Sequence, residues 1–217
     1  YARTALMSRH YIVKDYSVIP SPNTLGNIRE KKAVIYISFA NPKFYGRKMQ
    51  TIVDFATKHF DHTVLLTSGY LYRHSYIGLN PVNPSIAQGL SLSFEKRYIH
   101  QELSVYKPLI AEGKISLQNW NDYCFSNAFY DQVQKMKALY ETSASIKAEI
   151  DEFSQSFLLN TPAIKRQIIP ASKTELFLRN NCESGVSFIL EELSMMSHLA
   201  NEGFPVILYP GTIFSLL

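Results

Sequence analysis

Cysteine is scarce in this sequence, and long apolar runs are missing. Only two cysteines, Cys124 and Cys182, occur among 217 residues, and they form neither a disulfide framework nor a CxxC metal motif. We therefore expect a protein of the reducing cytoplasm. The apolar runs, such as 33–37 and 205–209, are far shorter than the roughly 18 residues that span a bilayer. The sequence predicts no membrane partner.

Glycine is also sparse. The nine glycines are widely spaced, and the closest pair, Gly203 and Gly211, lies eight positions apart. Neither the GxGxxG dinucleotide fingerprint nor the Gly-x4-Gly-Lys phosphate loop is possible at that spacing. This excludes NAD, FAD and P-loop ATP sites of those types. His59 and His62 lie close together but lack a third ligand, so we expect no metal and no other cofactor.

Charged residues make up 18% of the chain, and the net charge of +4 is unevenly distributed. Residues 1–60 hold ten Lys and Arg against three Asp and Glu, whereas the remainder is net negative. A basic region suits a polyanion such as nucleic acid, because neutralising phosphates supplies most nonspecific affinity. An ordinary solvated surface is the alternative.

The hydrophobic pattern predicts an α/β fold in a single domain, 1–217, with a parallel sheet of about five strands covered by helices on both faces. Short β-branched runs predict strands, and apolar residues at a 3.6-residue period predict helices. The expected strands are 33–37, 63–67, 115–117 and 206–209. The expected helices are 47–60, 85–107 (stopped by Pro108), 130–159 and 184–199.

Ser38 directly follows the first predicted strand, where parallel sheets place their ligand crevices. Asn41 lies three residues on, and its amide could orient a substrate carbonyl or brace the loop. An α/β-hydrolase nucleophile elbow would need glycine at the positions of Tyr36 and Ala40, so that motif is absent. Ser38 is either a nucleophile of another kind or a hydroxyl that caps a turn.

Two adjacent glutamates and a tyrosine are further candidates. On the last predicted helix, Glu191 falls on a polar stripe that we expect to face water, whereas Glu192 falls on an apolar flank. Burial there would raise the pKa of Glu192 toward the range useful for proton transfer. The alternative is a snorkelling carboxylate at the edge of the stripe. Tyr209 ends the last strand, as a core-edge aromatic or as a phenol aimed into the Ser38 crevice.

Together these residues resemble the cyclodipeptide synthases, which join two aminoacyl groups from aminoacyl-tRNAs into a diketopiperazine. The segment 34–41 (VIYISFAN) is similar to the family's strand that ends in Ser, with Asn three residues on. The segment 188–192 (FILEE) resembles its Tyr-x-x-x-Glu helix, Tyr209-Pro210 resembles the Tyr-Pro ending of one subgroup, and Asn160 corresponds to an Asn before that helix. The resemblance implies a Rossmann-like monomer akin to class I aminoacyl-tRNA synthetase catalytic domains, without ATP-binding motifs.

The sequence departs from the family pattern in its expected substrate pocket. Tyr36 stands where the family commonly has a glycine that floors the pocket for the first amino acid, which favours small first substrates. Phe188 replaces a tyrosine that contacts the substrate amino group. The other expected pocket residues are Val34, Asn160 and Pro210.

The family's basic tRNA-binding helix would fall near 91–107, where the sequence offers Lys96 and Arg97 among few basic residues. We expect the basic N-terminal region, with Lys43 and Arg47, to compensate.

The resemblance implies covalent catalysis that uses two aminoacyl-tRNAs in each cycle. Ser38 attacks the ester of one aminoacyl-tRNA to form an aminoacyl-enzyme, without ATP because the ester is already activated. The amine of a second aminoacyl-tRNA then attacks, with Glu192 as the proton carrier, to leave a dipeptidyl-enzyme that cyclises. Tyr209 and Asn41 position the acyl group and stabilise charge on its oxygen.

Two other functions fit the same residues. One is an α/β serine hydrolase or acyltransferase in which Ser38 pairs with a histidine such as His74. The other is a noncatalytic RNA-binding α/β module, in which the basic region binds and Ser38 caps a turn.

Overall fold

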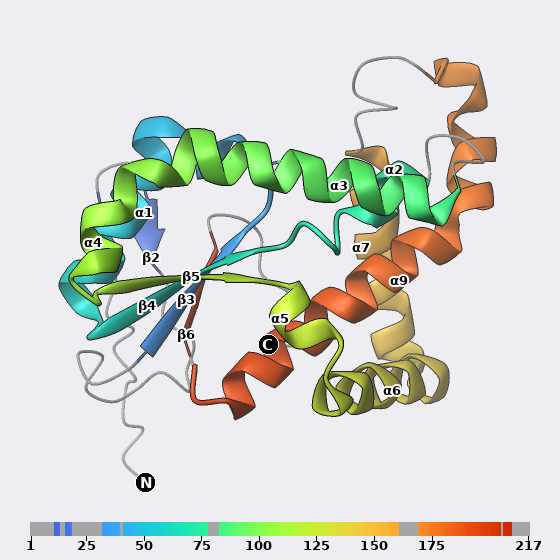
Figure 1. Ribbon diagram of the computed structural model, residues 1–217. Helices are drawn as coiled ribbons and strands as arrows, with labels where there is room; N and C mark the ends of the chain where they lie inside the picture. The colour runs from blue at the N-terminus through green and yellow to red at the C-terminus, as the bar shows by residue number, and fades with distance from the viewer. Residues whose placement is uncertain are drawn as a thin grey trace, which may run out of the picture.

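A four-stranded parallel sheet forms the centre of the protein (Figure 1). The computed structural model describes residues 11–13, 16–18, 32–39, 41–77, 83–160, 169–204 and 206–209. The strand order is β5-β4-β3-β6, formed by Ile115–Asn119, His62–Thr67, Lys32–Ile37 and Val206–Leu208. A separate antiparallel pair joins β1 (Tyr11–Val13) to β2 (Tyr16–Val18).

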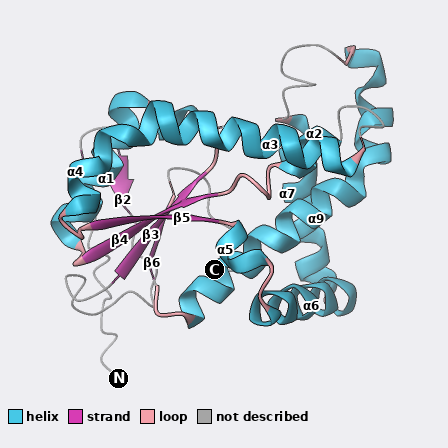
Figure 2. Ribbon diagram, in the orientation of Figure 1, coloured by secondary structure: helices cyan, strands magenta, loops and turns pink. Residues whose placement is uncertain are grey.

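The helices cover both faces of this sheet, as the sequence predicts (Figures 1 and 2). Helices α1, α3 and α4 lie on one side, and α6, α7 and α9 lie on the other. The α-helices are α1 (Gly46–His59), α2 (Arg73–Ile77), α3 (Pro84–Tyr98), α4 (Lys107–Ala111), α5 (Asn121–Cys124), α6 (Asn127–Thr142), α7 (Ala144–Leu159) and α9 (Thr174–Asn201). The short helices are the 3-10 turns η3 (Pro42–Phe44), η5 (Ser104–Tyr106) and η6 (Ala171–Lys173), with a π-helical segment, η4 (Ile99–Leu103). In the described part of the chain, no helix is long and apolar enough to cross a bilayer.

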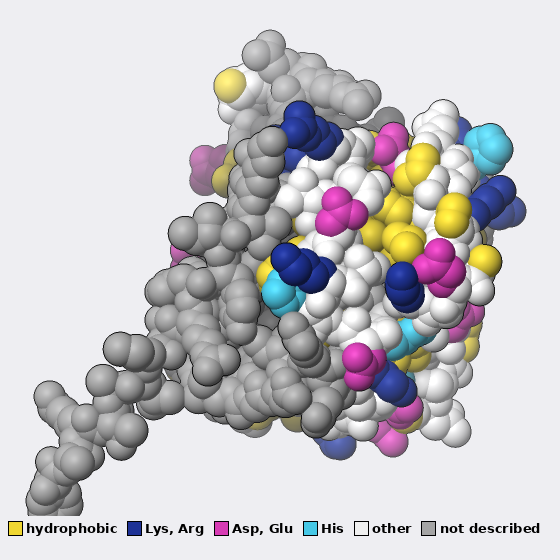
Figure 3. All heavy atoms as spheres, turned by 90° about the vertical axis from the view of Figure 1, so that its left-hand side faces the viewer, with side chains coloured by type: hydrophobic (Ala, Val, Ile, Leu, Met, Phe, Trp, Pro, Cys, Tyr) yellow, Lys and Arg dark blue, Asp and Glu magenta, His cyan; other side chains and the backbone are white. Residues whose placement is uncertain are grey.

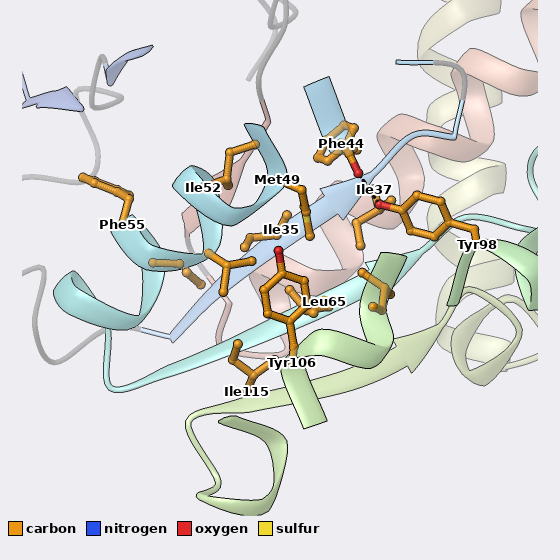
Figure 4. Close-up of a cluster of buried hydrophobic side chains, with 14 of the residues drawn as sticks. Ile35, Ile37, Phe44, Met49, Ile52, Phe55, Leu65, Tyr98, Tyr106 and Ile115 are labelled. Carbon is orange, nitrogen blue, oxygen red and sulfur yellow. Dashed lines mark hydrogen bonds between the residues drawn. The ribbon is translucent and has the colours of Figure 1, made fainter. Parts of the chain in front are cut away.

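Strand β3 is buried on both of its faces because successive side chains point in opposite directions. Ile35 and Ile37 enter one hydrophobic cluster with α1 and the segment from α3 to α4, and Figure 4 shows this cluster. Val34 and Tyr36 enter a second cluster with α6, α7 and α9. The strand is thus held from four directions, by β4, by β6 and by both helical layers.

The predicted strands are confirmed near their expected positions, but the sheet is smaller than expected. About five strands were predicted for this sheet, and the described residues supply four to it, one at each expected position. The helix expected at 85–107 is interrupted. The α-helical geometry ends at Tyr98, and a π-helical segment begins at Ile99. Pro108 is not the residue that stops the helix; it lies in the first turn of α4, where a missing backbone N–H costs nothing.

The helix expected at 130–159 is two helices. Ser143 adopts an extended conformation between α6 and α7, and its side chain accepts a hydrogen bond from the backbone N–H of Ile146 as the N-cap of α7. The apolar period continues across this break, which hides it in the sequence. The helix expected at 184–199 begins earlier, at Thr174.

Gly185 of α9 lies at a tight contact with α7. A Cβ at this position would lie 3.2 Å from side-chain carbons of Leu158 and Ser154. We expect Gly185→Leu to lower the free energy of unfolding by about 1–3 kcal/mol, because the added side chain overpacks this contact. Urea denaturation measures the change. Gly89→Leu is the matched control, because Gly89 is a helical glycine with open space around it, and equal stability of the two variants would contradict the prediction.

Candidate functional site

Four residues expected to act together do meet at the carboxyl edge of the sheet. Ser38 directly follows β3, and Tyr209 directly follows β6, which pairs with β3 in parallel. The Tyr209 side chain forms hydrogen bonds with the side chains of Ser38 and Asn41. Glu192, from the middle of α9, is close enough to act electrostatically on the same phenol. A hydroxyl, an amide, a phenol and a carboxyl group therefore converge from three parts of the chain.

The loop that carries Ser38 is held by local hydrogen bonds. The backbone N–H of Asn41 donates to the carbonyl of Ser38 at 3.1 Å, which closes a tight turn. The side-chain oxygen of Asn41 accepts from the backbone N–H of Lys43 at 3.0 Å and caps η3. Asn41 thus braces the loop, one of its two expected roles, while its side chain also contacts Tyr209.

The Tyr209 phenol is in its neutral, proton-donating form at neutral pH. Burial raises the pKa of Tyr209, and the nearby Glu192 carboxyl raises it further, although the hydrogen bonds to Asn41 and Ser38 act in the opposite direction. Its ring packs against Tyr36 and Phe44, with ring centroids 6.3 Å and 5.6 Å away. A phenol fixed in this way can donate a hydrogen bond to developing negative charge beside Ser38.

Glu192 is 8% exposed, and burial raises the pKa of its carboxyl to about 8. The place of Glu192 on the apolar flank of the helix predicted both its burial and the upward shift of its pKa. A carboxyl group with this pKa exchanges protons near neutral pH, which suits a proton carrier.

The prediction that Glu191 faces water is wrong. Arg73 Nη2 donates to Glu191 Oε1 at 2.7 Å, and His74 Nε2 lies 3.2 Å from the same oxygen. Burial alone would raise the pKa of Glu191, but the contacts with His74 and Arg73 lower it overall. Helix α2 supplies both partners, so the side chain is covered by a neighbour that helical periodicity cannot reveal.

The expected pocket residues of β3 lie in a closely packed region. Val34 and Tyr36 are 0% and 1% exposed. The Tyr36 ring meets the indole of Trp120 edge to face, with centroids 5.7 Å apart. The Tyr36 hydroxyl and the Trp120 Nε1 have no hydrogen-bond partner among the described residues. Trp120 was missed, although its being the only tryptophan of the chain could have drawn attention to it.

Phe188 lies one helical turn before Glu192 on α9. Its ring stacks on Phe157 of α7 with centroids 3.9 Å apart, and it meets the imidazole of His74 edge to face. Asn160 lies at the end of α7 with its side chain exposed, and its Nδ2 donates to the carbonyl of Ser156 at 2.7 Å. Pro210 is outside the described residues. The substrate-binding roles of these residues stay predictions.

The two basic segments expected to bind tRNA lie on neighbouring elements. Lys96 and Arg97 are exposed in the last turn of α3, and Lys43 and Arg47 are exposed around the start of α1. The Tyr98 hydroxyl of α3 donates a hydrogen bond to the carbonyl of Phe44 at 2.6 Å, which Figure 4 shows. The backbone N–H of Gly46 donates to Glu102 of η4, the segment that follows α3.

The surface on the side of α1 and α4 carries charges of both signs (Figure 3). Lys and Arg side chains alternate there with Asp and Glu and do not form one continuous basic field.

The described residues contain no group of three or more His, Cys, Asp or Glu side chains that could hold a metal ion. His62 instead lies 3.1 Å from the carbonyl of Gly113 and 3.0 Å from the Ser116 hydroxyl.

The protein therefore has a parallel, Rossmann-like α/β fold with a polar cluster at the carboxyl edge of its sheet. No protein-family model and no curated protein matches the chain. Its fold is similar to that of solved cyclodipeptide synthases. One, from Fluoribacter dumoffii, superposes with a TM-score of 0.74 at 15% identity over 85% of this chain and 79% of the other.

Two further structures show the same likeness. A cyclodipeptide synthase from Candidatus Glomeribacter gigasporarum, bound to Phe-tRNAPhe, has a TM-score of 0.68 and 17% identity over 88% of this chain and 81% of that one. A third structure is that of a Mycobacterium tuberculosis protein, which is described as demonstrating that cyclodipeptide synthetases are related to type I tRNA synthetases. It has a TM-score of 0.56 and 12% identity over 78% of this chain and 68% of that one. At these identities the likeness establishes the fold.

The raised pKa of Glu192 predicts a pH-dependent stability. Between about pH 4.5 and about pH 8, the unfolded chain releases a proton that the folded chain keeps, so the free energy of unfolding falls as the pH rises. The slope is at most about 1.4 kcal/mol per pH unit for one proton. We expect Glu192→Gln to remove this part of the slope, measured by urea denaturation at several pH values.

Glu183→Gln is the matched control for this experiment, because it removes an exposed carboxylate from the same helix. The control is expected to keep the slope of the unaltered protein. Parallel stability curves for Glu192→Gln and Glu183→Gln would contradict the assignment of a raised pKa to Glu192.

Proposed function

We propose that this protein is a tRNA-dependent cyclodipeptide synthase that works through an aminoacyl-Ser38 intermediate. The observation that supports this most directly is the convergence of Ser38, Asn41 and Tyr209, with Glu192 beside them. These are the residues that the family resemblance selected from distant parts of the sequence. The fold shared with solved cyclodipeptide synthases supports the same conclusion.

In the first step, the Ser38 hydroxyl oxygen attacks the ester carbonyl of an aminoacyl-tRNA. A new ester forms on Ser38, the bond to the terminal ribose oxygen breaks, and the serine proton leaves with that oxygen. Tyr209 is a neutral phenol next to Ser38, so it can donate a hydrogen bond to the carbonyl oxygen as charge develops. No ATP is consumed because the aminoacyl ester is already activated.

The second step must leave the dipeptide on Ser38. Attack by the amine of the second aminoacyl-tRNA would instead leave the dipeptide on the tRNA, so the direction expected from the sequence is wrong on atom balance. In the proposed step, the amine of the aminoacyl-enzyme attacks the ester of the second aminoacyl-tRNA, forms the peptide bond and releases that tRNA.

Cyclisation completes the reaction. The free amine of the dipeptidyl-enzyme attacks the Ser38 ester, which closes the diketopiperazine ring and returns the serine hydroxyl. Each attacking amine must lose a proton. A Glu192 carboxyl with a pKa of about 8 is matched to an amine that titrates in the same range.

The closely packed floor around Tyr36 and Trp120 supports a small first amino acid. Both side chains are buried and pack against each other, and Tyr36 lies two residues before Ser38 in the chain. Membership of the Tyr-Pro subgroup also belongs to this proposal, supported by the place of Tyr209 in the cluster. We further propose that the protein acts as a monomer in the cytoplasm.

The hydrolase alternative receives less support. A Ser38 hydrolase needs a histidine base in contact with the serine hydroxyl. The Ser38 side chain is instead hydrogen-bonded to Tyr209, and the His74 ring contacts Glu191 and Phe188. The noncatalytic RNA-binding alternative does not explain why Ser38, Asn41 and Tyr209 are hydrogen-bonded together beside Glu192. It predicts tRNA binding that does not depend on whether the 3′ end is aminoacylated.

Ser38→Ala tests the covalent mechanism. Mass spectrometry of the medium from bacteria that express the protein is expected to find a cyclic dipeptide, which identifies both amino acids. Ser38→Ala is expected to abolish that product without changing the melting temperature by more than a few degrees, because Ser38 is only partly buried. Continued synthesis by a folded Ser38→Ala protein would refute the aminoacyl-serine intermediate.

The double variant Lys96→Ala/Arg97→Ala tests the proposed tRNA surface. Its affinity for aminoacyl-tRNA should fall, and the slope of log affinity against log salt should decrease by about 1 for each phosphate that is no longer neutralised. Filter binding over a salt series measures both quantities. Lys135→Ala/Lys137→Ala is the matched control, since it removes two exposed charges from α6. Equal reductions in both variants would show that net charge, not this surface, governs binding.

A further inference from the structure

Helix α3 carries a buried glutamate that has no part in the mechanism above. Glu95 is only 5% exposed, on the inner face of the helix, whereas its neighbours Lys96 and Arg97 are exposed. Glutamate is almost never fully buried without partners, because removing a carboxylate from water is costly. The partners of Glu95 therefore indicate what its burial achieves.

Glu95 is bound by the turn that follows β4. The backbone N–H of Gly69 donates to Glu95 Oε1 at 3.0 Å, and the Thr67 side chain also forms a hydrogen bond with the carboxyl group. Burial raises the pKa of Glu95, and these two contacts offset part of that rise. The contact joins residues 26 positions apart and ties α3 to the end of the central sheet.

The fit between Glu95 and Gly69 leaves no room for a side chain. A Cβ at residue 69 would overlap Cδ and both oxygens of the Glu95 carboxyl group. Gly69 does not have a positive φ. The backbone conformation therefore does not demand glycine, but a side chain at this position would displace the Glu95 carboxyl group.

The same turn is hydrogen-bonded to the strand that ends just before Ser38. The Ser68 hydroxyl, 3% exposed, donates to the carbonyl oxygen of Ile37 at 2.7 Å. Ile37 is the last residue of β3 and directly precedes Ser38. A continuous path of hydrogen bonds and short chain segments thus runs from Glu95 through Gly69 and Ser68 to Ile37.

We propose that Glu95 is a positioning residue for the nucleophile: it fixes the turn after β4, and Ser68 transmits that position to Ile37 and Ser38. This inference rests on the proposed function, since it takes Ser38 to be the group that is acylated. Misplacing a reacting group by about 1 Å can cost a hundredfold in rate, so a displaced turn slows acylation. Substrate binding on the outer face of α3 is unaffected.

Single-turnover acylation separates this role from a binding role. With enzyme in excess over labelled aminoacyl-tRNA, Glu95→Ala and Ser68→Ala are each expected to slow the formation of aminoacyl-Ser38 at least tenfold. The Kd for aminoacyl-tRNA, measured in a Ser38→Ala background, should change less than twofold. Glu95→Gln keeps an oxygen that accepts from Gly69 and is expected to retain most of the rate. Glu141→Ala, an exposed change on α6, is the control.

Two combined variants test the path itself. Because Glu95 and Ser68 act in series, the double variant Glu95→Ala/Ser68→Ala should be no slower than the slower single variant. Gly69→Ala should be severely slowed, because its Cβ overlaps Glu95. Adding Glu95→Ala to Gly69→Ala should restore the rate to that of Glu95→Ala alone.

A second measurement needs no tRNA. In a protein with Cys124→Ser and Cys182→Ser, the substitution Ser38→Cys introduces the only thiol. The rate at which iodoacetamide alkylates this thiol reports the position of the side chain at residue 38. Glu95→Ala and Ser68→Ala should change that rate by a similar factor, and Glu95→Gln and Glu141→Ala should leave it near the reference.

The outcomes distinguish the two proposals. If the unaltered protein forms no aminoacyl-enzyme, the proposed function fails, while the alkylation rates still test the positioning of residue 38. A folded Glu95→Ala protein that acylates and alkylates at the reference rates would overturn the positioning role, and so would multiplicative losses in the double variant. If Glu95→Ala does not fold, Ser68→Ala carries the test, because it removes the hydrogen bond to Ile37, and acylation and alkylation at the reference rates in that variant would overturn the proposal.

Discussion

Strand β3 is packed on both faces and hydrogen-bonded along both edges, and the position of the candidate site depends on this packing. A strand held in this way cannot rotate or slide without exposing apolar side chains to water. Its end is therefore a fixed point, and Ser38 is the first residue beyond it. The neighbouring β6 runs parallel to β3, so Tyr209 emerges at the same edge although it is 171 positions away in the chain.

The two adjacent glutamates of α9 show how environment assigns different properties to identical side chains. Glu191 turns toward Arg73 and His74 and is ionised in a salt-bridged cluster, where it also ties α2 to α9. Glu192 turns toward the sheet, where burial favours its neutral form. The difference follows from a rotation of about 100° per residue around the helix. One glutamate thus contributes to holding the helix in place, and the other is left able to exchange a proton.

Helix α3 connects the outer surface to the same edge of the sheet. Its inner face presents Glu95 to the turn after β4, and its outer face presents Lys96 and Arg97 to the solvent. Departure from regular α-helical geometry begins just after these residues, in the π-helical segment from Ile99. A single helical turn therefore serves both the proposed tRNA surface and the placement of the proposed nucleophile, through opposite faces.

Local pattern alone determined much of this protein: the α/β class, the strands that end just before Ser38 and Tyr209, and the burial of Glu192 all follow from hydrophobic periodicity. The resemblance of short motifs then selected the four residues that meet. Other features depended on contacts between distant segments. The pairing of Glu191 with α2, the packing of Trp120 on Tyr36 and the fit of Glu95 against Gly69 involve partners 26 to 118 positions apart. Periodicity describes which face of an element is apolar, but only the packed tertiary structure decides which polar group lies opposite a given side chain.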